Sequence, residues 1–333
     1  MIELRDVRKE YLGKAAAGGK VVALDGISMQ VAKGSIHGIV GQSGAGKSTL
    51  IRCLTALEKP TSGTITVDGQ DLTALGSKDL RLARRKIGMV FQTANLLDSR
   101  TAAGNIAYPL YLAGVPKGAR HDRVQELLTL VGLGDRGSSY PSQLSGGQRQ
   151  RIGIARALAD EPAVILCDEP TSALDTETTG QVLHLLRDVR DRLGVTIIII
   201  THEMSVVREV CDSVTLLENG RIVETGRVED ILMNPHSVLS RELIPPPVVD
   251  VAPVLDGRTT VLIDVAFTSS PGKPTGSEVM GLAASVGADI AGGTFETVGS
   301  TQVGRLVLAV PTDLVNHVNQ TLLSKGLITE VRS

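Results

Sequence analysis

Gly41-Gln42-Ser43-Gly44-Ala45-Gly46-Lys47-Ser48-Thr49 decides the fold of the first two thirds of this chain. The stretch fits G-x-x-x-x-G-K-[ST], the pattern of a phosphate-binding loop. The apolar run 35–40 before it predicts a strand, and Leu50, Leu54 and Leu57 after it share one face of a predicted helix. Glycines let successive N–H groups surround a polyphosphate, and a helix N-terminus adds partial positive charge. We therefore predict a nucleoside triphosphate site, with Lys47 at the β- and γ-phosphates and Ser48 as a Mg²⁺ ligand.

Length and composition suggest two domains and argue against a nucleic-acid partner. The chain has 333 residues, of which 42% are hydrophobic and 21% are charged, and its net charge is −2. Such a balance lacks the basic surface that nucleic acids attract. Aromatic residues make up 2% of the chain and Trp is absent, so stacking platforms for single strands are not expected either.

The cysteines and the N-terminus bear on cellular location. Cys53, Cys167 and Cys211 are far apart in the sequence, which predicts buried thiols in a reducing compartment. Residues 1–6 lead directly into strand-like alternation, so we expect no signal sequence. No run approaches the roughly 18 apolar residues of a membrane helix. These features predict a cytoplasmic protein, which can still dock on a membrane component.

Strands and helices alternate through the rest of the first domain. We predict strands at 2–9 and 21–31, joined by the loop 13–20, then a turn, strand and turn over 62–69 and a strand over 86–92 that ends on Gln92. Residues 93–143 are Leu-rich and interrupted by Pro109, Pro116 and Pro141, which indicates a helical insertion in an α/β domain.

A second glycine-containing stretch is Leu144-Ser145-Gly146-Gly147-Gln148, followed by an amphipathic pattern over 149–159. Ser-Gly-Gly before a helix offers a side-chain cap and open backbone amides to an anion. The apolar run 163–167 then predicts a buried parallel strand that ends in Asp168 and Glu169. Such sheets bind ligands at the carboxyl ends of their strands. We therefore predict that Asp168 holds Mg²⁺, directly or through water, and that Glu169 orients or deprotonates the water that attacks the γ-phosphate.

Another apolar strand, 195–200, leads to His202, after the run Ser172-Ala173-Leu174-Asp175 and a predicted helix. A histidine at the end of a strand in this sheet is expected near the γ-phosphate. Residue 206 is Val, so the H-E-x-x-H pattern of zinc proteases is absent.

These motifs, in this order, resemble the nucleotide-binding subunit of an ABC transporter over about residues 1–240. The resemblance implies an ATPase in which Tyr11 stacks on adenine, Gln92 senses Mg²⁺ and water, and Glu169 is the catalytic base. His202 becomes the γ-phosphate switch, and Asp175 contributes to a dimer contact. It also implies a head-to-tail dimer, with each ATP between the phosphate loop of one copy and Leu144–Gln148 of the other.

The resemblance also implies partners that this chain lacks. They are two copies of a membrane permease subunit, and through them an extracytoplasmic substrate-binding protein, which would place the chain peripherally at the cytoplasmic face of the cell membrane. The insertion 93–143 is where the family docks its permease. Leu96, Leu97, Leu110 and Leu112 are candidates for that contact, although all four could equally belong to the core.

Beyond residue 243 the pattern changes. Residues 244–256 are Pro-rich and predict a semi-rigid linker. Over 257–333 we predict strands at 259–267, 289–298, 302–310 and 327–331 and helices at 277–286 and 312–325. That βαββαβ order is the ferredoxin-like arrangement of an α+β domain. About 75 residues make a marginal core, which favours pairing with a second copy.

An ABC subunit followed by this module resembles the ATPase of bacterial methionine importers, whose C-terminal domain is an ACT-like sensor. That resemblance implies import inhibited by intracellular L-methionine, for which Met280, Ile290, Ala291 and Gly292 are the candidate site. The alternative is an ABC ATPase for another substrate, or a lipoprotein or drug exporter, with a C-terminal dimerisation module that binds no ligand.

Overall fold

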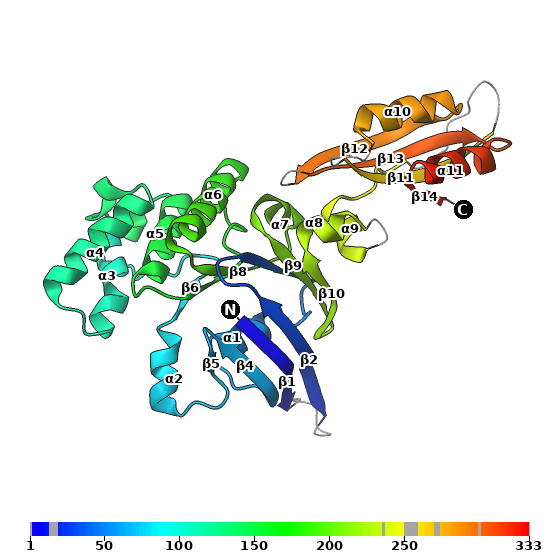
Figure 1. Ribbon diagram of the computed structural model, residues 1–333. Helices are drawn as coiled ribbons and strands as arrows, with labels where there is room; N and C mark the ends of the chain where they lie inside the picture. Colours follow the sequence, from blue (N-terminus) through cyan, green and yellow to red (C-terminus); the bar gives the residue numbers. More distant parts are fainter. Residues whose placement is uncertain are drawn as a thin grey trace. The chain divides into compact units, whose positions relative to one another are not determined.

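The protein forms two compact units, Met1–Thr225 and Gly226–Ser333 (Figure 1). The computed structural model describes residues 2–12, 19–234, 237–249, 259–269, 274–298 and 301–332. The predicted loop 13–20 and the predicted linker 244–256 therefore lie partly outside the described residues.

A six-stranded sheet forms the centre of the first unit. Its order is β10 (Arg221–Arg227), β9 (Ser213–Glu218), β3 (Ile36–Val40), β8 (Thr196–Thr201), β7 (Val164–Asp168) and β6 (Ile87–Val90). β3 pairs in parallel with β8 and β9, and β7 pairs in parallel with β6 and β8. Every residue of β3 and β8 is buried, because helices cover a parallel sheet on both faces.

An antiparallel sheet accompanies it, with the order β2 (Lys20–Val31), β1 (Ile2–Leu12), β4 (Ser62–Val67) and β5 (Gln70–Asp71). Ile2, Leu4, Leu24, Ile27 and Ile65 from this sheet share one hydrophobic core with Leu50 and Leu54 of α1 (Lys47–Leu54). β1 continues to Leu12, beyond the predicted end at residue 9, because its pairing with β2 persists to Leu12 and Lys20.

Helices account for most of the remaining first unit. They are α2 (Ser77–Arg84), α3 (Ala102–Leu112), α4 (Lys117–Leu130), α5 (Gly146–Leu158), α6 (Thr176–Leu193) and α7 (Met204–Val210), with short 3-10 turns at Gly134–Arg136 and Pro141–Gln143. The predicted insertion 93–143 is therefore helical. One expectation was wrong: Pro109 does not interrupt α3, which continues to Leu112. The proline removes one backbone donor, but the buried side chains of Ile106 and Leu110 on either side of it keep this part of the helix packed.

The second unit holds the predicted βαββαβ pattern: β11 (Thr260–Ser269), α10 (Gly276–Ser285), β12 (Asp289–Val298), β13 (Thr301–Pro311), α11 (Val315–Ser324) and β14 (Ile328–Val331). The sheet order β12-β13-β11-β14 is antiparallel throughout and is that of a ferredoxin-like fold. Val279 and Ala283 of α10 and Val318 and Leu322 of α11 pack on one face of the sheet.

The second unit also includes α8 (Val228–Leu232) and α9 (Val238–Leu243), so it begins before the predicted boundary at residue 243. The physical reason is a set of polar contacts between α9 and the sheet. Arg305 of β13 donates to the Ser240 hydroxyl at 2.9 Å, and Arg241 pairs with Glu330 of β14 at 2.8 Å.

Candidate active site

The phosphate loop joins the end of β3 to α1. Gly46 precedes the helix with φ of 106°, and a Cβ there would lie 2.6 Å from the carbonyl oxygen of Ala23. Only glycine combines this conformation with so close an approach. No side chain caps the first turn of α1, so its N–H groups remain available to an anion.

Lys47 begins α1, and its ammonium group turns back over the loop. It donates hydrogen bonds to the carbonyl oxygens of Gly41 and, at 2.9 Å, of Gln42. Burial lowers the pKa of Lys47, while the charges of Glu169 and Asp168 act in the opposite direction. The lysine therefore lies in the field of both acids that end β7.

Asp168 and Glu169 lie at the carboxyl end of β7. Burial and then the charge of Glu169 raise the pKa of Asp168, and Lys47 lowers it. Glu169 has φ of 46°, uncommon for a residue with a side chain, and its N–H donates to the carbonyl oxygen of Ile200 at 2.8 Å. This turn directs the carboxylate to His202, whose Nδ1 donates to Oε1 of Glu169 at 3.0 Å.

These groups line one cavity of about 720 Å³. Residues from the phosphate loop and α1, the two acids after β7, and His202 after β8 line it. The lining residues are Val21, Val22, Ala23, Gln42, Ser43, Gly44, Gly46, Lys47, Ser48, Thr49, Asp168, Glu169, Ile200 and His202. The arrangement follows from the parallel sheet, because β3, β7 and β8 all end at the same edge.

Tyr11 and Gln92 do not line this cavity. The Tyr11 hydroxyl donates to Glu58 at 2.5 Å, and Lys9 Nζ lies 5.1 Å from the centre of its ring. Tyr11 is nevertheless paired across β1 and β2 with Val21, which does line the cavity. Gln92 is exposed in the loop after β6.

That loop is held by polar groups which sequence analysis missed. Gln150 of α5 donates to the carbonyl oxygen of Phe91 at 3.0 Å, and Arg156 donates to those of Ala94 and Asn95 at 2.6 Å each. Asn105 is fully buried and holds both the N–H and the carbonyl of Leu97. The signal in each case was a polar side chain on the apolar face of a predicted helix.

The stretch 144–148 also lies outside the cavity. Ser145 caps α5, since its hydroxyl accepts from the N–H of Gln148 at 3.2 Å and the Gln148 side chain accepts from the N–H of Ser145 at 2.9 Å. Leu144 is buried. Asp175 caps α6 in the same way, accepting from the N–H of Thr178 at 3.0 Å, and these hydrogen bonds lower the pKa of Asp175.

The four residues predicted as a regulatory site lie on different elements and faces of the second unit. Met280 lies on α10, which packs on one face of the sheet, whereas Ala291 packs with Leu262, Val307 and Ala309 on the other face. A Cβ at Gly292 would lie 3.0 Å from Pro247. Met280 and Ile290 are each more than a third exposed. Met280 and Ala291 thus belong to opposite faces of the sheet, although they are close in the sequence.

Comparisons with known proteins agree with this fold and geometry. Residues 24–172 match the family described as ABC transporter. The chain is 49% identical to the methionine import ATP-binding protein MetN of Myxococcus xanthus, covering 99% of this chain and 98% of that protein. It is 50% identical to the protein of that name from Thermobifida fusca, covering 99% of each.

Among solved structures, the chain is similar to a dimeric ATP-binding cassette in a post-hydrolysis state bound to ADP and Pi. The identity is 34% and the TM-score 0.62, over 68% of this chain and 99% of that one. It is also similar to cbiO1 from Clostridium perfringens, with 28% identity and a TM-score of 0.64 over 73% of this chain and 95% of that one. The chain therefore belongs to the ABC transporter family and is one of its ATPases.

Proposed function

We propose that this chain is the ATP-hydrolysing subunit of an importer of methionine. The observation that carries the proposal is the cavity in which the phosphate loop meets Asp168, Glu169 and His202. Relatives named methionine import ATP-binding protein, which match nearly the whole chain, support methionine as the substrate.

In this proposal Glu169 receives the proton of the attacking water. Its carboxylate is anchored by His202 on one side and by its own strained backbone on the other, so it needs little reorganisation during the reaction. Lys47 exchanges its bonds to loop carbonyls for bonds to the β- and γ-phosphate oxygens. Val21 to Ala23 supply an apolar wall for the adenine ring of ATP, and Tyr11 on the neighbouring strand is the residue that stacks on it.

Ser48 and Asp168 fit a Mg²⁺ ion, because both present oxygen atoms to the cavity. The described residues contain no cluster of three His, Cys, Asp or Glu that could hold a metal by themselves. Mg²⁺ commonly takes one or two protein ligands together with phosphate and water, and it neutralises charge on the transferring phosphoryl group. Gln92 completes this set in the proposal, from a loop held by Gln150 and Arg156.

A second copy of the chain supplies the other half of each ATP site. Leu144–Gln148 lies at the start of α5 and does not line the ATP cavity of its own chain, and the similar solved cassettes are dimers. We propose the head-to-tail arrangement, in which Ser145, Gly146 and Gly147 meet the nucleotide of the partner and Asp175 lies at the contact.

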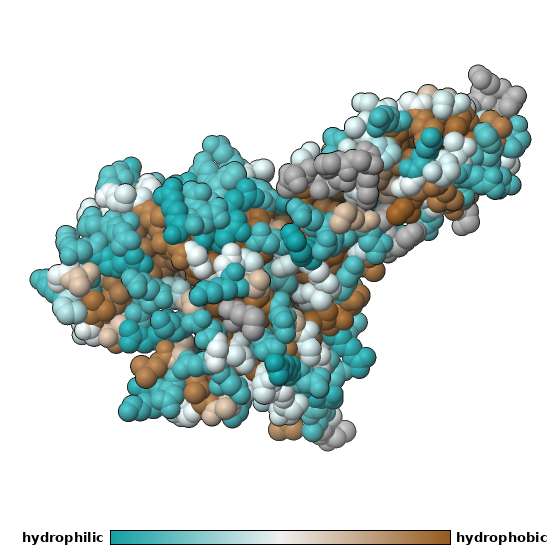
Figure 2. Space-filling model, viewed as in Figure 1, coloured by the Kyte–Doolittle hydropathy of each residue, from teal (hydrophilic) through white to brown (hydrophobic). Residues whose placement is uncertain are grey.

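A groove in the first unit is the docking site for the permease in this proposal. It has a volume of about 630 Å³. Apolar residues of β6 and α3 line it together with polar and charged side chains, namely Arg81, Arg84, Arg85, Asn95, Arg156 and Asp160. Leu112 lines it and is 67% exposed, whereas Leu110 is buried core. Apolar side chains also reach the surface beside α2 and α3 in Figure 2. No helix within the described residues is long and apolar enough to cross a membrane.

These features support a peripheral subunit at the cytoplasmic face of the membrane, bound to two permease subunits and, through them, to an extracytoplasmic substrate-binding protein. The second unit adds regulation in this proposal: L-methionine bound there inhibits transport. Because Ile290 and Ala291 belong to the edge strand β12, two copies side by side could complete a site that one copy lacks.

Glu169→Gln tests the catalytic part of the proposal. We expect the variant to bind ATP normally and to hydrolyse it at least about a hundredfold more slowly, because the base is lost while the shape of the side chain is kept. Steady-state phosphate release measures the rate, and labelled ATP measures binding. The control is Lys47→Ala, which should lose binding itself. Normal turnover in Glu169→Gln would refute the assignment.

A further inference from the structure

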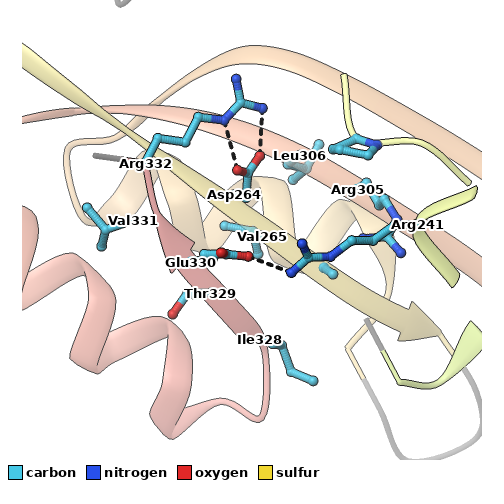
Figure 3. A pocket seen from close by; sticks show the side chains of 12 residues that line it. Arg241, Asp264, Val265, Arg305, Leu306, Ile328, Thr329, Glu330, Val331 and Arg332 are labelled. Atoms are coloured by element: carbon cyan, nitrogen blue, oxygen red, sulfur yellow. Dashed lines mark hydrogen bonds and ion pairs between the residues drawn. The ribbon is translucent and has the colours of Figure 1, made fainter. Parts of the chain in front are cut away.

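The second unit holds a separate cavity of about 400 Å³ between α9 and the sheet (Figure 3). Ile263, Val265, Leu306 and Leu308 belong to the core beneath α10 and α11. Because side chains alternate along strands, Asp264 of β11 and Arg305 of β13 point to the opposite face, on which this cavity lies. A volume of this size is typical of small-molecule sites.

Two of the three arginines that line the cavity have carboxylate partners. Arg332 binds both oxygens of Asp264 at 2.8 Å and also donates to the carbonyl oxygens of Pro247 and Val249. Arg241 pairs with Glu330 at 2.8 Å. Asp264 and Glu330, the two carboxylates that line the cavity, are therefore each bonded to an arginine, as the dashed lines in Figure 3 show.

Arg305 is the exception. Its side chain is buried, with 6% of the residue exposed, yet its one hydrogen-bond partner among the described residues is the neutral hydroxyl of Ser240. Its Nε is buried and has no partner among them. The residues directly opposite it on the neighbouring strands are Ala266 and Thr294. The acid on this face of β11, Asp264, lies two residues further along the strand and gives both of its oxygens to Arg332.

A buried guanidinium that contacts no carboxylate is unfavourable, because burial removes the water that solvates its charge. A single hydroxyl, here that of Ser240, replaces only a small part of this solvation. Burial and the charge of Arg241 lower the pKa of Arg305, and Asp264 offsets this only in part. The remainder of the cavity wall includes Pro246 and Ile328, which offer apolar contacts, and Thr329, whose hydroxyl donates to Asn319.

We propose that this cavity binds a small organic carboxylate, with the anionic group on Arg305 and the apolar part against Pro246 and Ile328. A guanidinium presents parallel N–H groups that match the two oxygens of a carboxylate. The lining carries one more positive than negative side chain, which matches a monoanion better than the dianionic form of phosphate. The site is distinct from the ATP cavity and does not depend on what the transporter carries.

The test uses the full chain labelled with ¹⁵N-arginine, with butyrate as the probe. The Nε–H signal of Arg305 is assigned as the one that disappears in Arg305→Met, a substitution of similar volume that removes the buried charge. We expect butyrate to shift this signal saturably and butylamine to leave it unchanged. Arg305→Lys keeps the charge but loses the two parallel N–H groups of the guanidinium. It should bind butyrate about tenfold more weakly, as read from the backbone signals of β13 in uniformly ¹⁵N-labelled protein.

Arg227→Met is the matched control, because it removes an exposed arginine of the same unit that does not line the cavity. It should bind butyrate as the unaltered chain does. The proposal is overturned if butyrate leaves the Arg305 signal unchanged, or if Arg305→Met binds butyrate as well as the unaltered chain. Tighter binding of inorganic phosphate than of butyrate would overturn the assignment to a carboxylate.

Discussion

His37 lies in the middle of the parallel sheet, where a positive charge would have no partner. It is 2% exposed, and its ring nitrogens contact the hydroxyls of Ser213 at 2.7 Å and Thr215 at 2.9 Å. Burial lowers the pKa of His37 to about 4, from an ordinary value of about 6.5. The unfolded chain therefore takes up a proton below pH 6.5 that the folded protein excludes until about pH 4.

The free energy of unfolding should thus fall as pH drops from about 6.5 to about 4, by about 3 kcal/mol from this residue alone. The stabilising contribution is complete above pH 6.5. We expect His37→Gln to be less stable at pH 7.5 but to lose less stability on acidification, as measured by urea unfolding at several pH values. His184→Gln, at an exposed position of α6, should keep the steeper dependence. Parallel profiles for His37→Gln and the unaltered chain would contradict this explanation.

At the scale of elements, α5 approaches α6 closely through a single glycine. A Cβ at Gly147 would lie 2.3 Å from Cγ2 of Thr178, whose N–H and hydroxyl both bond to Asp175. Gly147→Ala should therefore push the helices apart or disturb the cap of α6. We expect a loss of about 1–3 kcal/mol in the free energy of unfolding.

Thr178→Ser removes the clashing methyl group and keeps the hydroxyl, so the double variant should recover part of the loss. Gly146→Ala is the control, since its Cβ would lie 3.4 Å from Leu174, an ordinary contact. Thermal unfolding of the unaltered chain, Gly147→Ala, Thr178→Ser and the double variant gives a complete double-mutant cycle. Strictly additive effects of the two substitutions would show that the methyl contact is not the cause.

At the scale of the whole molecule, the proposed regulation links the second unit to hydrolysis in the first. L-methionine should inhibit the ATPase activity of the transporter assembled with its permease, because a ligand that binds one state of the dimer more tightly shifts the population to it. A chain that ends after Arg227, the last residue of β10, should keep its ATPase activity and lose the inhibition. Equal inhibition of both chains would place the methionine effect elsewhere.

The local patterns of the sequence were sufficient for the fold and for most of the residues that meet in the cavity at the phosphate loop. The phosphate loop, the apolar strands that end at Asp168 and His202, and the βαββαβ order were all predicted, because backbone conformation and burial depend on residue type and spacing. Parallel strands end at one edge, so residues 41–49, 168–169 and 202 had to lie together.

The tertiary structure alone decided the rest. The packing of α10 on one face of the sheet placed Met280 away from Ala291, which packs on the other face. The contacts of α9 with β13 and β14 joined residues 226–243 to the second unit. Arg305 and Asn105 were not singled out from the sequence. The reason is that the charge balance of a cavity and the partners of a buried amide depend on residues far apart in the chain, which meet only when the sheets and helices pack.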